Sequence, residues 1–600
     1  MNDLTKNTLK YVSDHKKGLT DDGCIIESSR DDKNVIKLIR GSKQIYLGSR
    51  YNVQRDIDNV MSKLQNINSQ TLIIVFGLGT GEHIKSILHS LKFQNKILII
   101  EPCAEVIKKF LKLNYSKYIL QDKRIYLIYF QEDIKFLISN FINEINVYNL
   151  SIIIFPNYDR VFIRQYRKFV KCLKEIRNSV IVNLSTALKL SQRFFSSLVK
   201  NISYIPQSIA VNKLKKIYRD MPAIVVSSGP SLEKNMDQLK ELQKYFIIIS
   251  GLRNLKALIE IGVTPDFLCV IDSMEINYSF IKNYLNLNIP LLIYENSNSK
   301  VIENYKGPKI LYVSNKQFCK LLGYDVDLLY QGGSVAHTCT SLAAYMGCNP
   351  IIFIGQDLAY TNDKLHADNT SNSSFNDISI KEGINKDYIW TENVHGNKVK
   401  TSEVFNSFRT RLEDFIKFHK DTEFVNSTEG GANIKGTKVL DLKTSGRIYK
   451  KSEKNREIVR DIVNDKNNRF DSEKIKKEVI ENKKNLEDIL KYIEKFKTDI
   501  DNLNLYYNGN RSVNINRIMS RLDKFDNFIK KNCDEFFLVN DLLNPVVLTV
   551  MSDKKFILLE SDKEETKGKK IAAKYKILYD DIIKEINTAL PMIEKSIKKF

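Results

Sequence analysis

Short apolar runs alternate with amphipathic stretches over the first part of the chain. The runs at residues 71–76, 96–100, 125–130 and 151–155 have the length of buried strands, and 84–91 has a helical pattern. Strands separated by helices need crossover connections, which predicts a parallel sheet. A long amphipathic stretch at 165–200 predicts a helix that closes this region.

The same alternation begins again after residue 202. Helical patterns occur at 232–242, 254–261, 334–346 and 403–419, and a polar stretch at 361–387 predicts a loop. Strand-like runs lie at 222–228, 245–250, 267–272, 290–295, 309–313, 350–354 and 423–427. The pattern is typical of a doubly wound α/β domain with a parallel, Rossmann-like sheet.

Strand patterns stop at about residue 441. Apolar residues then recur at helical spacing among Lys, Glu, Asp and Asn, which predicts a helical bundle. We therefore expect three domains: an α/β Rossmann-like domain at 1–200, a central doubly wound α/β domain at 201–440 and an α-helical domain at 441–600.

The net charge of +22 does not change this picture of a globular protein. Hydrophobic residues make up 43% of the 600 residues, and charged residues 27%. Residues 441–600 carry 35 basic and 28 acidic side chains, which is close to their proportional share of the excess. Because no basic tail exists, nucleic-acid binding is not expected, and the positive charge suits an anionic small molecule instead.

The spacing of the cysteines and the length of the apolar runs indicate which cellular compartment and which metal sites to expect. The eight cysteines are widely spaced without a Cys-x-x-Cys pair, so neither a disulfide framework nor a zinc ribbon is expected. The N-terminus shows no signal-peptide pattern, and no apolar run approaches the roughly 18 residues of a membrane span. We expect a soluble, cytoplasmic protein without a transmembrane segment.

Two glycine-containing turns lead from the central region into predicted helices. Ser228-Gly229-Pro230-Ser231 follows the run at 222–228, and Gly332-Gly333-Ser334 opens the helix at 334–346. Unpaired N–H groups and the helix dipole attract anions at such positions, so both turns are candidates for binding a nucleotide phosphate. The alternatives are an ordinary helix cap at the first turn and a packing glycine pair at the second.

Further polar side chains follow the later strands, at the sheet edge where α/β proteins bind ligands. An imidazole is a natural general base near neutral pH, so His366 and His395 are candidates for that role; the alternative for each is a solvated loop side chain. The remaining candidates at strand ends are Asp272, Gln356, Asp357, Tyr360, Ser427, Thr428 and Glu429.

A third glycine-rich turn lies in the N-terminal region. Gly77, Gly79 and Gly81 follow the strand at 71–76, and Glu101 ends the next strand. This spacing resembles a fingerprint for adenosyl ligands, in which the acidic residue holds ribose hydroxyls. The alternative is that the glycines serve close packing.

The central motifs together resemble the motility accessory factor (Maf) family of flagellin glycosyltransferases, in family order over about residues 221–437. They are 224–232 (IVVSSGPSL), 262–267 (GVTPDF) with Asp272, 332–336 (GGSVA), 347–361 (GCNPIIFIGQDLAYT), 366–367 (HA) and 427–432 (STEGGA). The flanking regions agree with the family in size and layout.

The central domain of that family is in turn similar to bacterial sialyltransferases that use CMP-sialic acid. Their Gly-Asn-Gly-Pro-Ser turn for CMP matches Gly229-Pro230-Ser231, but Ser227-Ser228 replaces the Gly-Asn. Their second helix-start turn falls on 332–334, and their Gly-x-Asp segment on Gly355 and Asp357. Their catalytic histidine has two candidate counterparts, His366 in a family motif and His395 by spacing; His366 is preferred.

The resemblance implies an inverting protein O-glycosyltransferase. A pseudaminic or legionaminic type of nonulosonic acid would pass from CMP to Ser or Thr of flagellin, as flagellum assembly and motility require. His366, Asp357 or His395 would be catalytic, the turn and strand-end residues would bind the donor, and neither a cofactor nor a metal is required. Two alternatives are an S-adenosylmethionine-dependent methyltransferase using Gly77–Gly81 and Glu101, and a non-catalytic flagellin-binding protein.

Overall fold

The computed structural model describes the chain except for residues 15–22, 65–66, 92–93, 132, 362–363, 365, 368–387, 510–513 and 560. Most of the polar loop predicted at 361–387 thus lies outside the described residues. The chain forms two compact units. Unit 1 comprises residues 1–189, 493–525 and 544–583, and unit 2 comprises 190–492, 526–543 and 584–600. The C-terminal helices contribute to both units, whereas the three predicted domains follow chain order.

Unit 1 contains the parallel sheet predicted from its apolar runs. Its order is β6-β5-β4-β7, built from β4 (Leu72–Phe76), β5 (Ile97–Glu101), β6 (Ile125–Tyr129) and β7 (Leu150–Ile154). The connecting helices are α3 (Glu82–Ser90), α4 (Ala104–Phe110), α5 (Ser116–Gln121), α6 (Ile134–Ser139) and α7 (Tyr158–Val161). Every residue of β4 and β5 is buried, as their continuous hydrophobicity requires.

The first 65 residues add elements that the sequence analysis did not predict. They are α1 (Asp3–Asp14), an antiparallel sheet of β1 (Gly23–Ser28), β2 (Asn34–Arg40) and β3 (Lys43–Leu47), and α2 (Val53–Ser62). The strands β1 and β3 are largely exposed, so their sequences lack the continuous apolar run of the core strands.

Unit 2 is built on a nine-stranded sheet with the order β18-β17-β14-β9-β10-β11-β12-β13-β8, and every pairing in it is parallel. The strands are β8 (Ile209–Ala210), β9 (Ala223–Val226), β10 (Ile247–Gly251), β11 (Phe267–Cys269), β12 (Leu291–Ile293), β13 (Lys309–Leu311), β14 (Ile351–Ile354), β17 (Phe424–Asn426) and β18 (Lys438–Val439). The predicted doubly wound α/β fold is confirmed, with β9 between β14 and β10, where the strand order reverses.

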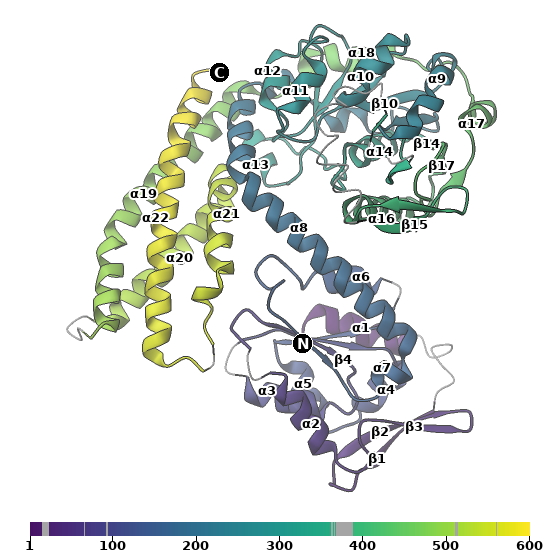
Figure 1. The fold of residues 1–600 in the computed structure, drawn as a ribbon. Helices are drawn as coiled ribbons and strands as arrows, with labels where there is room; N and C mark the ends of the chain where they lie inside the picture. The colour runs from purple at the N-terminus through teal and green to yellow at the C-terminus, as the bar shows by residue number, and fades with distance from the viewer. Residues whose placement is uncertain are drawn as a thin grey trace. The chain divides into compact units, whose positions relative to one another are not determined.

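Helices cover both faces of this sheet, as Figure 1 shows. They are α9 (Met236–Leu242), α10 (Leu255–Glu260), α11 (Ile276–Ile281), α12 (Ser299–Asn304), α13 (Phe318–Leu322), α14 (Val335–Tyr345), α16 (Glu403–Phe418), α17 (Leu442–Tyr449) and α18 (Glu457–Asn464). The helix predicted at 232–242 begins instead as a 3-10 segment, Pro230–Lys234. A hairpin of β15 (Ile389–Glu392) and β16 (Lys398–Thr401) precedes α16.

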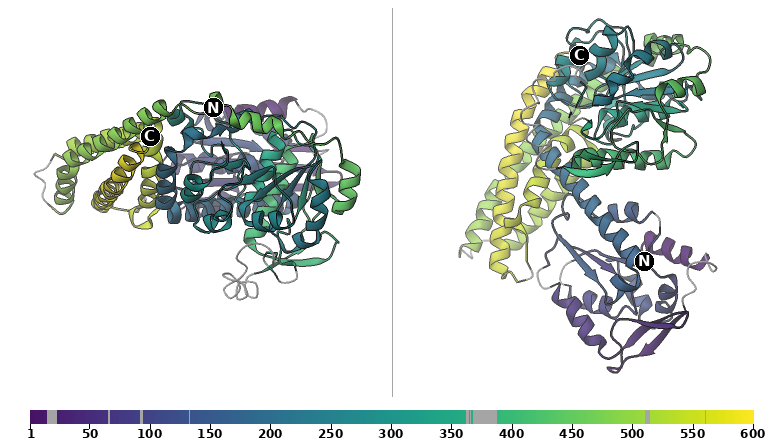
Figure 2. Two further views of the ribbon diagram at one scale, coloured as in Figure 1. Left: turned by 90° about the horizontal axis from the view of Figure 1, so that it is seen from above. Right: turned by 45° about the vertical axis from the view of Figure 1, so that its right-hand side comes forward.

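The C-terminal region is helical, as predicted. Its helices are α19 (Ser472–Tyr507), α20 (Ile515–Glu535), α21 (Phe537–Ser552) and α22 (Glu564–Ile597). Together with α8 (Ile163–Ile202), α19 and α22 are the longest helices, and the long C-terminal helices run side by side in both views of Figure 2. The rings of Phe525 on α20 and Tyr579 on α22 pack together with their centroids 4.5 Å apart. No helix in the described part of the chain combines the length and apolarity that crossing a membrane requires.

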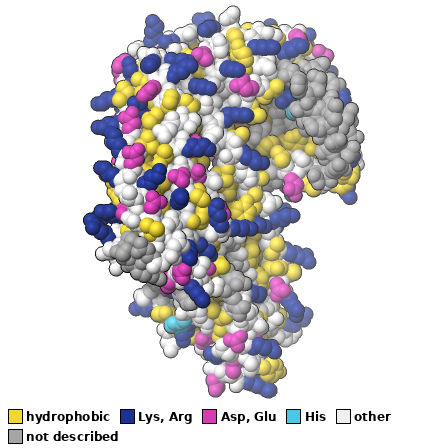
Figure 3. Space-filling model, turned by 60° about the vertical axis from the view of Figure 1, so that its left-hand side comes forward, with side chains coloured by type: hydrophobic (Ala, Val, Ile, Leu, Met, Phe, Trp, Pro, Cys, Tyr) yellow, Lys and Arg dark blue, Asp and Glu magenta, His cyan; other side chains and the backbone are white. Residues whose placement is uncertain are grey.

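The positive charge is dispersed. Figure 3 shows Lys and Arg side chains spread over the visible face, with acidic side chains among them, rather than gathered into one basic patch. This distribution agrees with the proportional spread of the net charge along the sequence.

Candidate functional site

A cavity of about 290 Å³ lies at the carboxyl ends of the central strands of unit 2. We call it the central cavity. It sits where the strand order reverses around β9, which is the usual ligand site in a doubly wound sheet. The turns after β9, β10, β11 and β14 and the start of α14 form its walls. The predicted residues that line it are Ser228, Gly229, Asp272, Ser334, Gln356, Asp357 and His366.

The turn after β9 is locked to the turn after β14. The Gly229 N–H donates to the Gly355 carbonyl at 2.8 Å, and a Cβ at residue 229 would overlap the Asp357 carboxylate. Ser231 donates to Asp357 Oδ2 through both its hydroxyl (2.7 Å) and its N–H (3.3 Å). The prediction that these N–H groups are free for a phosphate is therefore wrong, because protein oxygens already accept from them. Pro230 and Ser231 do not line the cavity.

The Asp357 carboxylate has a structural role in this arrangement. It is 2% exposed, and its second oxygen accepts from Thr361 Oγ1 at 2.6 Å. Burial raises its pKa, while the hydrogen bonds from Thr361 and Ser231 act in the opposite direction. Since both oxygens are engaged, we assign Asp357 to holding the two turns together and correct its predicted catalytic role.

Of the second predicted turn, Ser334 lines the central cavity, whereas Gly332 and Gly333 do not. Ser334, Val335 and Ala336 line the central cavity, and the Ser334 side chain makes no capping hydrogen bond. The first N–H groups of a helix lack a partner in a preceding turn. Here the His337 N–H donates to the Ser334 carbonyl at 3.0 Å, which leaves the N–H groups of Val335 and Ala336 for an anion. Gly333, with φ of +91°, lies behind this turn, where a Cβ would come within 3.0 Å of Phe408 and Arg411. Gly332 likewise backs onto His337.

The sequence analysis missed a cation in the cavity. Arg253 follows β10, lines the cavity and stacks its guanidinium 4.8 Å from the centroid of the Phe280 ring. Burial lowers the pKa of Arg253, and the nearby Asp272 opposes that change. The Asp272 carboxylate accepts from Met274 N and Asn277 Nδ2. No sequence motif marks Arg253, and its place in the cavity depends on β10 lying beside β9 in the sheet.

The structure separates the two candidate histidines. His366 lines the central cavity, and its Nδ1 lies 3.4 Å from Ser228 Oγ. Burial, reinforced by the charge of Arg253, lowers the pKa of His366 to about 4, so the imidazole is neutral at pH 7. His395 is exposed in the turn between β15 and β16 and does not line the cavity. Of the two candidates, His366 is the one placed to accept a proton from a ligand in this cavity.

Of the other predicted contacts, Gln356 alone lines the central cavity, and the remaining four lie behind its wall. Gln356 lines the cavity and accepts from Ser227 Oγ, while its N–H donates to Thr428 Oγ1 at 3.2 Å. Buried Ser427 pairs with Ser445, and the Glu429 carbonyl accepts from Lys234. Tyr360 packs on Phe405, which itself lines the cavity. Thus Ser427, Thr428, Glu429 and Tyr360 support the wall rather than form its surface.

The glycine-rich turn of unit 1 is filled by aromatic side chains. A Cβ at Gly77 would come within 2.7 Å of Tyr158, and one at Gly79 within 3.1 Å of Phe155. Gly81 similarly abuts Phe110.

The Glu101 carboxylate beside this turn is also engaged. It accepts from Leu78 N (2.8 Å), Cys103 N (2.9 Å) and the Tyr158 hydroxyl (2.7 Å). Its burial raises its pKa to about 7. The predicted adenosyl contacts of Gly77, Gly79, Gly81 and Glu101 are therefore replaced by contacts within the protein, which is the packing alternative.

Comparisons with known proteins bear on this site. Residues 196–363, which carry most of the central cavity, match the family model described as 6-hydroxymethylpterin diphosphokinase MptE-like. A solved structure of a Maf glycosyltransferase from Magnetospirillum magneticum AMB-1 is similar over 99% of this chain and 96% of that chain, with a TM-score of 0.59 and 14% identity. The chain has the Maf fold. The Maf resemblance of the ordered motifs is thus confirmed at the level of fold. No curated protein matches the sequence.

Proposed function

We propose that this protein is a glycosyltransferase that moves a nonulosonic acid, of the pseudaminic or legionaminic type, from CMP to Ser or Thr of flagellin. The transfer would occur in the cytoplasm with inversion and would serve flagellum assembly and motility. Two findings support the proposal: the Maf fold of the chain and the chemistry of its central cavity.

The observation that carries the proposal is the convergence of a cation, a helix start and a neutral imidazole in one cavity. Arg253 and the first residues of α14 line it together with His366. The β10 end and the α14 start are adjacent, since a Cβ at Gly251 would lie 2.9 Å from Val335. Such a pairing of a guanidinium with free helix N–H groups suits a phosphate and a sugar carboxylate.

The reaction follows from these positions. His366 accepts the proton of the acceptor hydroxyl, whose oxygen forms a bond to the anomeric carbon from the face opposite the phosphate. The bond from that carbon to the phosphate oxygen breaks, and CMP leaves with the electron pair. Arg253 and the α14 N–H groups stabilise the charge on the departing phosphate. The scheme uses no cofactor, because a phosphate ester is already a good leaving group.

One observation favours a second candidate. The family model that matches 196–363 is described as a diphosphokinase, and such an enzyme would place the phosphates of a nucleoside triphosphate in the same cavity. A methyltransferase is not favoured, because Tyr158 and Phe155 occupy the glycine-rich turn where its cofactor would bind.

The test is transfer in a purified system. The protein is incubated with CMP-activated pseudaminic or legionaminic acid and unmodified flagellin, and the intact mass of flagellin is measured. We expect increments of one sugar residue, accompanied by release of CMP. Flagellin that binds without gaining mass would indicate the non-catalytic alternative. Conversion of ATP and a hydroxymethylpterin to a diphosphate product, without any flagellin increment, would instead establish the diphosphokinase.

A further inference from the structure

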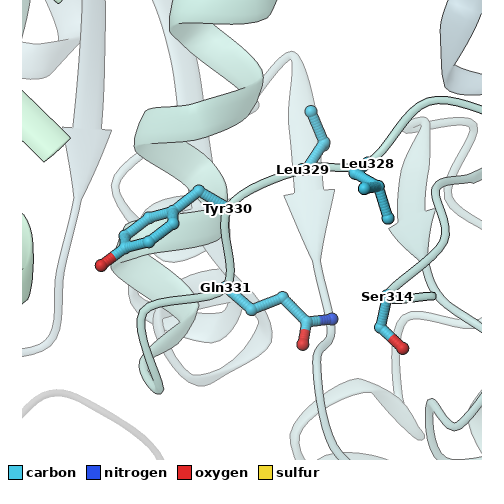
Figure 4. A pocket seen from close by; sticks show the side chains of 5 residues that line it. All are labelled: Ser314, Leu328, Leu329, Tyr330 and Gln331. Atoms are coloured by element: carbon cyan, nitrogen blue, oxygen red, sulfur yellow. The ribbon is translucent and has the colours of Figure 1, made fainter. Parts of the chain in front are cut away.

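A second cavity, of about 340 Å³, borders the loop that leads into α14. It is lined by Ser314, Leu328, Leu329, Tyr330 and Gln331 (Figure 4). Gln331 lines this second cavity and Ser334 lines the central cavity. Because consecutive Cα atoms are about 3.8 Å apart, the Cα atoms of these two residues are separated by at most about 11 Å.

The polar groups of the second cavity are hydrogen-bond acceptors. The Ser314 hydroxyl donates to Glu295, as does its N–H at 3.2 Å, so the Ser314 oxygen offers a lone pair. Gln331 Nε2 donates to the Tyr312 hydroxyl at 3.0 Å. No side chain or backbone N–H in the described part of the chain donates a hydrogen bond to Gln331 Oε1. In Figure 4 the Gln331 side chain extends toward Ser314, whereas the Ser314 hydroxyl and the Tyr330 ring point away from Gln331.

The remaining lining is apolar and accessible. Leu328 is 47% exposed and Tyr330 37% exposed, while Leu329 is buried. The second cavity therefore differs from the central cavity, in which a guanidinium and helix N–H groups provide donors and positive charge. Acceptor oxygens beside an apolar wall suit an extended polypeptide, which offers backbone N–H donors and alternating side chains.

We propose that the second cavity is an acceptor subsite, where an apolar residue of flagellin packs on Leu328 while a backbone N–H donates to Gln331 Oε1. The inference rests on the proposed function and deepens it. An extended chain advances about 3.3 Å per residue, so the distance of at most about 11 Å from Gln331 to Ser334 corresponds to roughly three residues between the flagellin residue at Gln331 and the Ser or Thr that reaches the central cavity. The subsite selects the sequence next to the modified residue rather than the modified residue itself.

The test compares Leu328→Glu with the wild type. We expect fluorescence anisotropy with labelled flagellin to show at least about tenfold weaker binding, because the new carboxylate faces acceptor oxygens and removes apolar contact. In the transfer assay, KM for flagellin rises by a similar factor, while KM for the CMP-sugar and calorimetric CMP affinity stay unchanged. Leu505→Glu is the matched control: Leu505 is 50% exposed on α19 and should leave both affinities unaltered.

Leu328→Ala is a second, milder variant, and we expect it to lower the affinity for flagellin by about threefold. Circular dichroism checks that each variant is folded. Equal flagellin affinity in the wild type and a folded Leu328 variant overturns the subsite. So does a wild type that does not bind flagellin. Absence of CMP binding or sugar transfer by the wild type would count against the proposed function instead, and the flagellin affinities would still decide the subsite.

Discussion

Among single residues, Arg253 and His366 contribute opposite properties to the central cavity. The guanidinium adds a positive charge beside Asp272, whereas the imidazole stays uncharged because it is buried near that guanidinium. Under the proposed function, Arg253 attracts the anionic donor and His366 accepts a proton. The two proposed roles can be measured separately, because donor binding depends on Arg253 and the rate of transfer depends on His366.

Replacing Arg253 with Gln should weaken CMP binding by about 10- to 100-fold, because a hydrogen bond to a charged group contributes roughly 1.5–3 kcal/mol. Isothermal calorimetry with CMP measures the change. Arg219→Gln is the control, as the Arg219 side chain is 79% exposed and does not line the cavity. Unchanged CMP affinity in Arg253→Gln would show that the phosphate lies elsewhere.

Replacing His366 with Ala should lower kcat by about 10²- to 10⁴-fold, the usual contribution of a general base, with little effect on KM for the CMP-sugar. A base must be neutral, and the pKa of His366 is lowered to about 4. Wild-type kcat should therefore fall only as the pH drops through about 4. His395→Gln serves as the control and should retain full activity; a large loss there would reverse the assignment.

At the scale of elements, predictions succeeded where the signal is local. The buried strands and the turn before α14 follow from continuous apolar runs and from glycines at a helix start. Two features of the site could not be predicted in this way. The place of Arg253 in the cavity depends on β10 lying beside β9. The hydrogen bond from Ser231 to Asp357 joins residues that are 126 apart in sequence. Tertiary packing determines the order of strands in a parallel sheet, and the hydrophobic pattern of a single strand does not predict that order.

The turn after β4 gives a prediction about stability. Gly77→Ala should destabilise unit 1 by roughly 3 kcal/mol, because Gly77 has φ of +112° and its new Cβ would meet the Tyr158 ring. Gly41→Ala isolates the backbone cost: Gly41 also has positive φ but has no atom within 4 Å of its Cβ position, so about 1 kcal/mol is expected. Urea denaturation measures both. Equal losses would mean that the aromatic packing at Gly77 is unimportant.

At the scale of the whole molecule, the two units both contain a parallel α/β sheet, but they differ at the edge where such sheets bind ligands. In unit 1 the turn after β4 is filled by Tyr158 and Phe155, whereas in unit 2 the corresponding sheet edge holds an open cavity. A nucleotide ligand should thus affect unit 2 and leave unit 1 unaltered.

Hydrogen exchange followed by mass spectrometry can locate that effect. CMP at 100 times its Kd should slow exchange in peptides that cover β9 and the start of α14, with a stabilisation of up to about 2.7 kcal/mol. Peptides that cover β4 and β5 should exchange at the same rate with and without CMP. S-adenosylmethionine should change neither set. Protection of β4 and β5 by S-adenosylmethionine would revive the methyltransferase alternative.

The contact of Gly229 with Gly355 and Asp357 has a consequence for ligand recognition. Two loops from opposite halves of the sheet are joined at their base before any substrate arrives, so little conformational entropy is lost there when one binds. A methyl group at residue 229 would force the two halves apart. The separation of these two turns at the wall of the central cavity therefore depends on the absence of a side chain at residue 229.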